Sequence, residues 1–348
     1  MIRVFQALAA AGAIAAAALP CPAGEPPPWA YPLLDPAVKA PADDGTKLRV
    51  PGSEAAYTHT ELYDVFLAAD WFPGAHPPMP EVVARGRKPE VRACGMCHQP
   101  NGQGRPENAA LAGLPAAYIV RQMKDFRDGK RTSAVPQAGP QIRMRASAVH
   151  ATDEEMRTAA AYFAAIPYKR WIRVVESQSV PKTEIVFGSL RAPSPGGGTE
   201  PIDDRIIEIP EDLRAVELHD PRAGFVAYVP PGAISRGEKL AAGGGDRPAC
   251  AACHGEGLRG LDPAPPIAGR STAYIVRQLY DFQSGARAGA MAELMKPVVE
   301  GLTTADFVAL AAFVASRDPD FEVRSNLILP VQPVSTKTLR LRGFHPAF

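Results

Sequence analysis

The chain has 348 residues and a formal net charge of +1, and this length predicts two domains of ordinary size. The hydrophobic fraction of 46% is ordinary for a globular protein, no stretch after residue 19 is long and apolar enough to span a membrane, and we expect no nucleic-acid partner. The 37 prolines indicate long irregular segments, and the low aromatic fraction of 7% leaves core volume for a large bound apolar group.

The first 23 residues have the pattern of a secretory signal peptide. One positive charge, Arg3, precedes an Ala-rich apolar run over residues 4–19, which is shorter than the ~20 residues that cross a bilayer. We expect cleavage after Ala23, with Cys21 as the small residue at −3, and Pro20 argues against a lipid anchor on Cys21. The mature protein is therefore expected in the periplasm.

Residues 24–80 form a Pro-rich N-terminal extension ahead of a first helical domain, residues 81–170. In this domain we expect a helix before a Cys-x-x-Cys-His motif, a second helix after Ala117, and a third that begins at Thr152. An acid three residues after Thr152 is typical of a capped helix start. The apolar residues of the third helix recur at helical spacing and predict its buried face: Met156, Ala159, Ala160 and Phe163.

Residues 171–230 connect this domain to a second helical domain, residues 231–320. The connector holds strand-like runs at 171–176, 205–209 and 225–229, and three consecutive glycines at 196–198 predict a loop tip. The second domain also ends in a helix that is capped by a threonine, Thr303, with the predicted buried face Phe307, Leu310, Ala311 and Val314. The tail, residues 321–348, alternates enough to add one more strand.

A fixed offset of 156 residues relates the two helical domains. It separates the two Cys-x-x-Cys-His motifs, and also segments 111–131 and 267–287, which are identical at 12 of 21 positions. The capped helices follow once a gap of five residues is allowed. A whole domain is therefore duplicated. Each copy is predicted to be an all-α unit of ~90 residues with too few long helices to form a large core without a cofactor.

Each motif places two thiols and an imidazole at the spacing used to attach haem. Two cysteines three residues apart lie on nearly one side of a helical turn, so both can form thioether bonds to haem vinyl groups while the adjacent histidine binds iron. The residues concerned are Cys94, Cys97 and His98 in the first domain and Cys250, Cys253 and His254 in the second. The sequence therefore predicts two covalently bound c-type haems.

Three other uses of these cysteines are less well supported by the pattern. Two disulfides are the plain alternative in an exported protein, but they do not account for the adjacent histidines. A structural zinc site would need the two pairs ~15–20 residues apart. A thioredoxin-like dithiol would need a βαβ setting, which is not predicted.

Comparison of the two copies of the repeat also indicates which residue is the second axial ligand of each iron. Met144 and Met295 each precede the threonine that begins the third helix by eight residues, and we expect each to reach iron from a loop. Met291 is the alternative in the second domain, and His150 is one in the first, although it has no counterpart in the second. Thioether ligation opposite histidine favours the reduced iron, and two filled axial positions favour electron transfer over substrate binding.

The order of these features, with LAG/IAG and YIVRQ after each motif, resembles the class I cytochromes c, and the duplicated form is similar to the dihaem cytochromes c4. The resemblance covers about residues 81–170 and 231–320. It implies a mainly α fold of two class I cytochrome c domains, with an irregular N-terminal extension and a β-containing connector.

The resemblance also implies a role for each ligand. His98 and His254 are then the proximal ligands, and the distal ligands are Met144 and Met295. In such cytochromes a proline carbonyl accepts a hydrogen bond from the proximal histidine. Pro265 has this place in the second domain, whereas Ala109 stands there in the first.

Charge is spread unevenly along the chain. Residues 81–170 hold 15 Lys and Arg against 8 Asp and Glu, a net charge of +7, whereas residues 231–320 carry −1. Residues 25–80 carry −5 and the connector carries −4. Either these acidic segments cover the basic domain, or the basic domain steers an acidic redox partner.

We therefore expect a periplasmic electron carrier, not an enzyme, that passes electrons between a dehydrogenase or membrane donor and a terminal acceptor. Its expected partners are redox proteins such as a dehydrogenase, an oxidase or another cytochrome, including membrane complexes that it contacts peripherally. One alternative is a dihaem peroxidase, which would need an open iron position. Another is a cytochrome subunit of a larger dehydrogenase, which the connector would help to bind.

Overall fold

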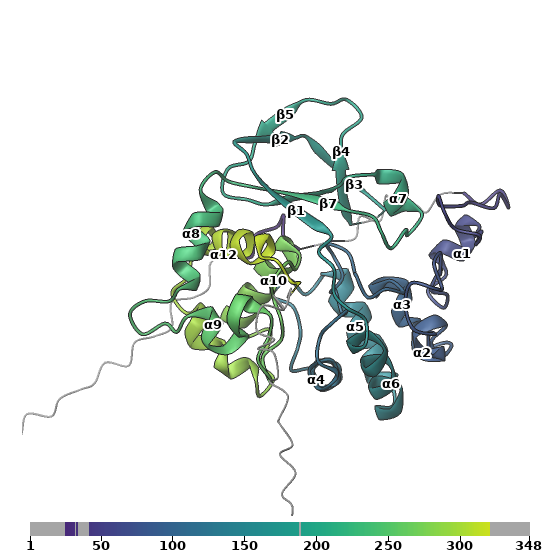
Figure 1. Ribbon diagram of the computed structural model, residues 1–348, viewed down its shortest axis with the longest axis horizontal. Coiled ribbons are helices and arrows are strands. Elements are labelled where there is room, and N and C mark those ends of the chain that lie inside the picture. The colour runs from purple at the N-terminus through teal and green to yellow at the C-terminus, as the bar shows by residue number, and fades with distance from the viewer. Residues whose placement is uncertain (1–24, 32, 34–41, 188, 321–348) are drawn as a thin grey trace, which may run out of the picture.

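A computed structural model describes residues 25–31, 33, 42–187 and 189–320. The signal peptide expected over residues 1–23 and the strand expected in residues 321–348 lie outside the described residues. Figure 1 shows two helical groups, one from each half of the chain, with the strands of the connector lying across one side of both. This arrangement places the two Cys-x-x-Cys-His motifs in separate helical groups.

The first helical group contains the three helices predicted for residues 81–170, the short motif helix α3 and one more. Thr152 caps the last helix through a reciprocal pair of hydrogen bonds with Glu155, as predicted. The additional helix, α5, carries Met144, which was expected in a loop. The helices are α2 (Glu81–Ala84), α3 (Cys94–His98), α4 (Ala116–Arg127), α5 (Gly139–His150) and α6 (Asp153–Ala164).

The second helical group repeats this order with two differences. Helix α10 begins and ends 156 residues after α4, but a short turn, η1, follows the motif helix, and two short helical turns replace the long α5. Thr303 caps the last helix together with Asp306, as predicted. The elements are α8 (Ala233–Ala241), α9 (Cys250–His254), η1 (Glu256–Leu258), α10 (Thr272–Gln283), η2 (Ala292–Leu294), α11 (Lys296–Val299) and α12 (Thr304–Ser316).

Apolar side chains from the predicted helix faces form the cores of both groups. The residues predicted for the buried face of α6 are at most 9% exposed, and those predicted for α12 are at most 6% exposed. Among the described residues no single helix is long and apolar enough to cross a membrane. The bent pair Ala292–Val299 and Thr304–Ser316, which meet at 117°, passes that test only when the two are counted together.

The connector forms the strands predicted for it and several that were not. Its main sheet has the order β1-β7-β6, with β1 parallel and β6 antiparallel to β7. The three strands correspond to the predicted runs, and the predicted glycine loop joins β4 to β5. The elements are β1 (Ile172–Glu176), β2 (Ser179–Pro181), β3 (Thr183–Val186), β4 (Leu190–Pro193), β5 (Thr199–Pro201), β6 (Ile207–Pro210), α7 (Leu213–Glu217) and β7 (Phe225–Val229).

The N-terminal extension is more ordered than its proline content suggested. It contains a short capped helix, α1 (His59–Tyr63), and a buried Trp71 whose indole N–H donates to the carbonyl oxygen of Leu218 at 2.8 Å. The extension therefore packs against the connector as well as against the first helical group.

Candidate functional site

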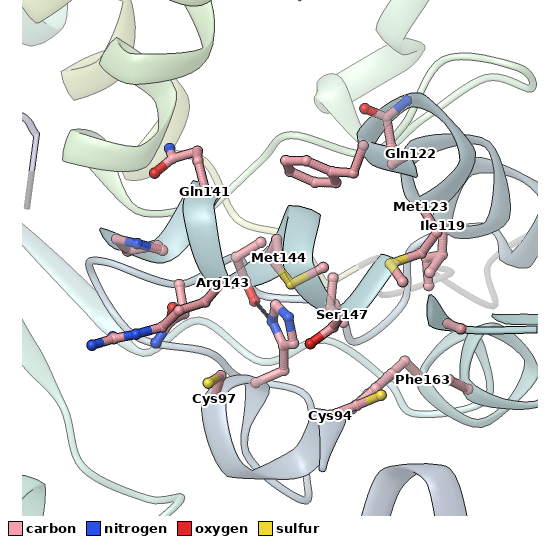
Figure 2. A pocket seen from close by; sticks show the side chains of 18 of the residues that line it. Cys94, Cys97, Ile119, Gln122, Met123, Gln141, Arg143, Met144, Ser147 and Phe163 are labelled. Carbon is pink, nitrogen blue, oxygen red and sulfur yellow. Dashed lines mark hydrogen bonds between the residues drawn. The ribbon is translucent and has the colours of Figure 1, made fainter. Parts of the chain in front are cut away.

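Each Cys-x-x-Cys-His motif opens onto a largely apolar cavity in its own helical group. The first cavity is lined by Cys94, Cys97, His98 and Met144, together with apolar side chains from α4, α5 and α6. Figure 2 shows both thiols on the short helix α3 and the side chain of Met144 reaching toward the same space from α5. The second cavity is lined by Cys250, Cys253 and His254.

A backbone carbonyl orients the imidazole in both motifs. Nδ1 of His98 lies 2.8 Å from the carbonyl oxygen of Ala109, and Nδ1 of His254 lies 2.8 Å from that of Pro265. The expected bond is thus present in both copies, because any residue can supply the carbonyl. Burial lowers the pKa of both histidines, so the rings are neutral, Nδ1–H donates to the carbonyl, and Nε2 keeps its lone pair for a metal.

The thiols are in an environment that disfavours the thiolate. Burial raises the pKa of Cys94 to about 12 and also raises the pKa values of Cys97 and Cys250. Redox-active dithiols need the opposite shift, so this environment argues against the thioredoxin-like alternative. The four cysteines of the motifs form no disulfide in the part of the chain that the structure describes.

The first cavity brings Met144 together with the motif but leaves His150 outside. Met144 lines the cavity, whereas His150 is exposed at the end of α5. Met123 and Met156 also line the cavity, although both pack into the hydrophobic core as expected. Because Met144 projects from α5, this helix rather than a loop sets its position.

The second cavity is lined by both methionines that the sequence offered as alternative axial ligands. Met291 precedes η2, Met295 lies between η2 and α11, and both line the cavity. Met295 also packs against the core of this group, whereas Met291 does not belong to it. The geometry therefore places both near His254, and Met295 remains a prediction.

The two cavities meet at the contact between the helical groups. Their shared lining residues come from both copies of the repeat: Leu114, Tyr118, Gln122, Arg131, Tyr274 and Gln278. Oε1 of Gln122 accepts hydrogen bonds from Arg131 at 2.8 Å and from Arg287 at 2.7 Å. Oε1 of Gln278 accepts from the same two guanidinium groups at 2.9 and 3.0 Å.

This four-residue cluster of Gln122, Gln278, Arg131 and Arg287 was not predicted as part of the site. Its members are related by the 156-residue offset, and all four lie within the two repeated segments. This repetition is the sequence feature from which the cluster could have been predicted. All four are at most 8% exposed. Neither guanidinium forms an ion pair with a carboxylate among the described residues. Burying two like charges without such a partner is costly in free energy.

The residues present fit a covalently attached haem in each cavity. Each site offers two thiols on one helical turn, an oriented neutral imidazole, a thioether sulfur and apolar walls, which are the groups such a cofactor needs. Within the described ranges no cluster of three or more His, Cys, Asp or Glu residues could hold a bare metal ion. The chemistry of the site is therefore that of an iron porphyrin rather than of a protein-ligated ion.

Comparisons with known proteins agree with this chemistry. The cytochrome c family model matches residues 83–166. Cytochrome c4 of Azotobacter vinelandii is 25% identical over 230 residues, which cover 65% of this chain and 84% of that protein. Cytochrome c-554(548) of Halomonas halodenitrificans is 36% identical over 70 residues, which cover 20% of this chain and 84% of that protein.

Two further similarities involve proteins of thiosulfate oxidation. The thiosulfate dehydrogenase electron acceptor of Thiomonas intermedia is 26% identical over 235 residues, which cover 66% of this chain and 80% of that protein. Among solved structures, a thiosulfate dehydrogenase from Marichromatium purpuratum aligns with a TM-score of 0.42 and 27% identity over 70% of this chain. The aligned region spans 41% of that structure's chain.

Proposed function

The chain belongs to the cytochrome c family and carries covalently bound c-type haem, and from this we propose that it is a periplasmic dihaem carrier that passes electrons from a dehydrogenase or membrane donor to a terminal acceptor. The proposed haem domains are residues 81–170 and 231–320. The extension, residues 24–80, and the connector, residues 171–230, would hold them together.

The observation that supports this function best is the common wall of the two cavities. Two sites with the same donor set, each in its own copy of the repeat, share lining side chains such as Tyr118, Gln122 and Tyr274. A carrier needs its two redox centres close to each other and shielded from water. Residues that line both cavities at once meet the first of these needs.

We assign the proximal ligands to His98 and His254 and the distal ligands to Met144 and Met295. When bound, the haem supplies a one-electron iron couple, and the protein holds it through thioethers from Cys94, Cys97, Cys250 and Cys253. The carbonyls of Ala109 and Pro265 fix the two imidazole rings. A methionine in each cavity disfavours the peroxidase alternative, which needs an open iron position.

We assign Arg131 and Arg287 to the neutralisation of the haem carboxylates. Both guanidinium groups are buried, share amide oxygens and lack a carboxylate partner in the described part of the chain. Arg131 lines both cavities, and Arg287 lines the second. Buried cations of this kind need a nearby anion, and each haem brings two propionates.

The proposed electron donor is a dehydrogenase, which docks on α5 through an acidic surface. This helix exposes Arg143 and Arg145 beside the cavity-lining Met144, and neither arginine forms an ion pair among the described residues. Some other cations of the first group do form ion pairs, as Arg87 does with Glu155. The relative named as an electron acceptor of thiosulfate dehydrogenase makes a sulfur-oxidising dehydrogenase the donor class to test first.

The alternative that the chain is a fixed subunit of a larger dehydrogenase rests on the connector. Its strands lie outside the two haem domains and give the chain a surface that a minimal two-domain carrier would not have (Figure 1). Purification from the native membrane and soluble fractions distinguishes the two. A free carrier elutes alone, whereas a subunit elutes with a larger catalytic chain.

Denaturing mass spectrometry tests the cofactor assignment. The mature chain should carry the mass of two haems, and the Cys250→Ala/Cys253→Ala variant should carry one, on the peptide that contains Cys94 and Cys97. Haem that is extracted by acidified acetone, or a native chain with one haem, would contradict the proposal.

A further inference from the structure

A buried carboxyl group, Glu107, lies between the first haem cavity and a second, separate cavity. It lines both. The separate cavity has a volume of about 280 Å³ and is formed by the N-terminal segment, the connector and α10. Glu107 is thus the one acidic side chain among the described residues that faces the haem cavity on one side and this space on the other.

The hydrogen bonding of Glu107 is incomplete. Its side chain is 9% exposed, and Oε2 has no hydrogen-bond partner. Oε1 receives only a long hydrogen bond of 3.4 Å from Asn108 and lies 4.0 Å from the guanidinium of Arg105. Burial raises the pKa of this carboxyl group, which Arg105 opposes. A buried carboxylate with a bare oxygen is held close to protonation.

The second copy of the repeat lacks this group although the same pair of backbone hydrogen bonds closes the turn there. Arg105 and Asn108 close a tight turn through two backbone hydrogen bonds, and Leu261 and Ala264 close the equivalent turn. The position 156 residues after Glu107 is Pro263. Both turns lead directly into the residue whose carbonyl orients the proximal histidine, so the carboxyl group is a specific addition to the first site.

We propose that Glu107 is a redox-linked proton-binding site, which takes up one proton from solvent as the first haem takes up one electron from a donor protein. This rests on the proposed function, because it requires a haem bound at His98. The carboxylate becomes a carboxylic acid, the iron goes from ferric to ferrous, and the added charge of the electron is cancelled by the proton. Oxidation by the acceptor returns the proton through the separate cavity.

The other carboxyl groups that line the two cavities, Glu155, Glu208 and Asp281, accept shorter hydrogen bonds than Glu107 does. Arg277 stabilises the turn that carries Glu107, because its guanidinium donates to the carbonyl oxygen of Pro106 at 2.6 Å. Glu208, across the separate cavity, accepts hydrogen bonds from Ser271, Thr272 and the backbone of Ala273. Besides Glu107, Glu208 and Arg277, the ionisable groups that line the two cavities are Tyr31, Arg92, Cys94, Cys97, His98, Tyr118, Arg131, Arg143, Glu155, Arg191, Tyr274 and Asp281.

The two haem potentials, measured from about pH 5 to about pH 9, test this site, since that range spans ordinary and raised carboxyl pKa values. One potential should fall with pH, by at most a tenfold change in equilibrium constant, or about 59 mV, per pH unit. The other should change less. In Glu107→Gln the larger slope should disappear, and in Glu107→Asp, which keeps a carboxyl group, it should persist over a shifted range.

A direct readout does not depend on any variant folding. Reduction of the native protein in unbuffered solution should take up a proton, and the infrared difference spectrum should gain the C=O band of a protonated carboxylic acid. The inference is overturned if this band is absent, or if Glu107→Gln retains the slope, which would then belong to a propionate. If mass spectrometry found no haem on Cys94 and Cys97, the proposed function would fail instead.

Discussion

Gln122 of the first helical group accepts a hydrogen bond from Arg287 of the second, with 2.7 Å between Oε1 and Nη2. The same oxygen accepts from Arg131, and Gln278 mirrors the arrangement. One amide oxygen thus serves two buried cations where the two cavities meet. The contact between the haem domains depends on these shared acceptors as well as on apolar packing.

Replacement of Gln122 by leucine should therefore destabilise the holoprotein. Two buried guanidinium N–H groups would lose their acceptor, at a cost of about 2–5 kcal/mol in the free energy of unfolding. Denaturant titration monitored by the haem absorbance measures this. Gln137→Leu, at an exposed position, is the control and should change stability little. Equal stability of the two variants would show that the shared amide oxygen contributes nothing.

A second prediction concerns His76 in the N-terminal extension. Its Nε2 lies 3.1 Å from Oδ1 of Asp70, and its Nδ1 lies 2.9 Å from both the carbonyl oxygen of Pro77 and the hydroxyl oxygen of Tyr162. That hydroxyl donates to the carbonyl oxygen of Pro100, so both ring nitrogens face acceptors and the imidazolium fits best. The hydrogen bond to Asp70 raises the pKa of His76 although burial opposes it.

Because this pKa is raised on folding, the stabilisation from His76 is complete below its ordinary pKa of about 6.5 and is lost as pH rises through the folded value. The denaturation midpoint of the native protein should then fall relative to that of His76→Gln as pH rises over this range. A difference between the two proteins that does not change with pH would contradict the charged assignment.

A third prediction concerns the distal ligands. Met144→Ala and Met295→Ala should each remove the weak far-red sulfur-to-iron band at one haem, lower its potential, and let it bind carbon monoxide, since a thioether stabilises the reduced iron. Met123→Ala is the matched control, because Met123 lines the first cavity but is assigned to the core. If Met291→Ala has these effects and Met295→Ala does not, the assignment in the second domain is wrong.

A fourth prediction concerns the basic surface of α5. The rate of reduction by an acidic donor should fall steeply with ionic strength, because exposed charges are screened over ~10 Å at 0.1 M salt. Charge reversal at Arg143 and Arg145 should slow the reaction at low salt and flatten its salt dependence. The control is reversal of Arg173 on the connector. A native rate that is independent of salt would place the docking surface elsewhere.

The sequence predicted what is local or repeated. The capping boxes at Thr152 and Thr303, the paired helices α4 and α10, and the motif helices all follow from short-range patterns, and the structure confirms them. Helix α5 was not predicted because its apolar residues do not form a continuous buried face. Ile142 and Val149 are exposed, and Met144 faces a cavity rather than the core.

Other features depend on contacts between distant residues. Trp71 meets Leu218 across 147 positions, and Arg131 meets Gln278 across the same number. Neither pairing leaves a pattern in the local sequence. The strands β2 to β5 are three or four residues long, too short for their periodicity to stand out. The two cavities of Glu107 likewise exist only after the extension, the connector and both helical groups are assembled.

The most direct test of the carrier assignment is the reaction of the fully reduced native protein with carbon monoxide. With Met144 and Met295 on the two irons, neither haem has a free position, and stopped-flow mixing at neutral pH should show little binding and an unchanged low-spin spectrum. Rapid binding of one carbon monoxide per chain would reveal an open iron and would favour a dihaem peroxidase instead.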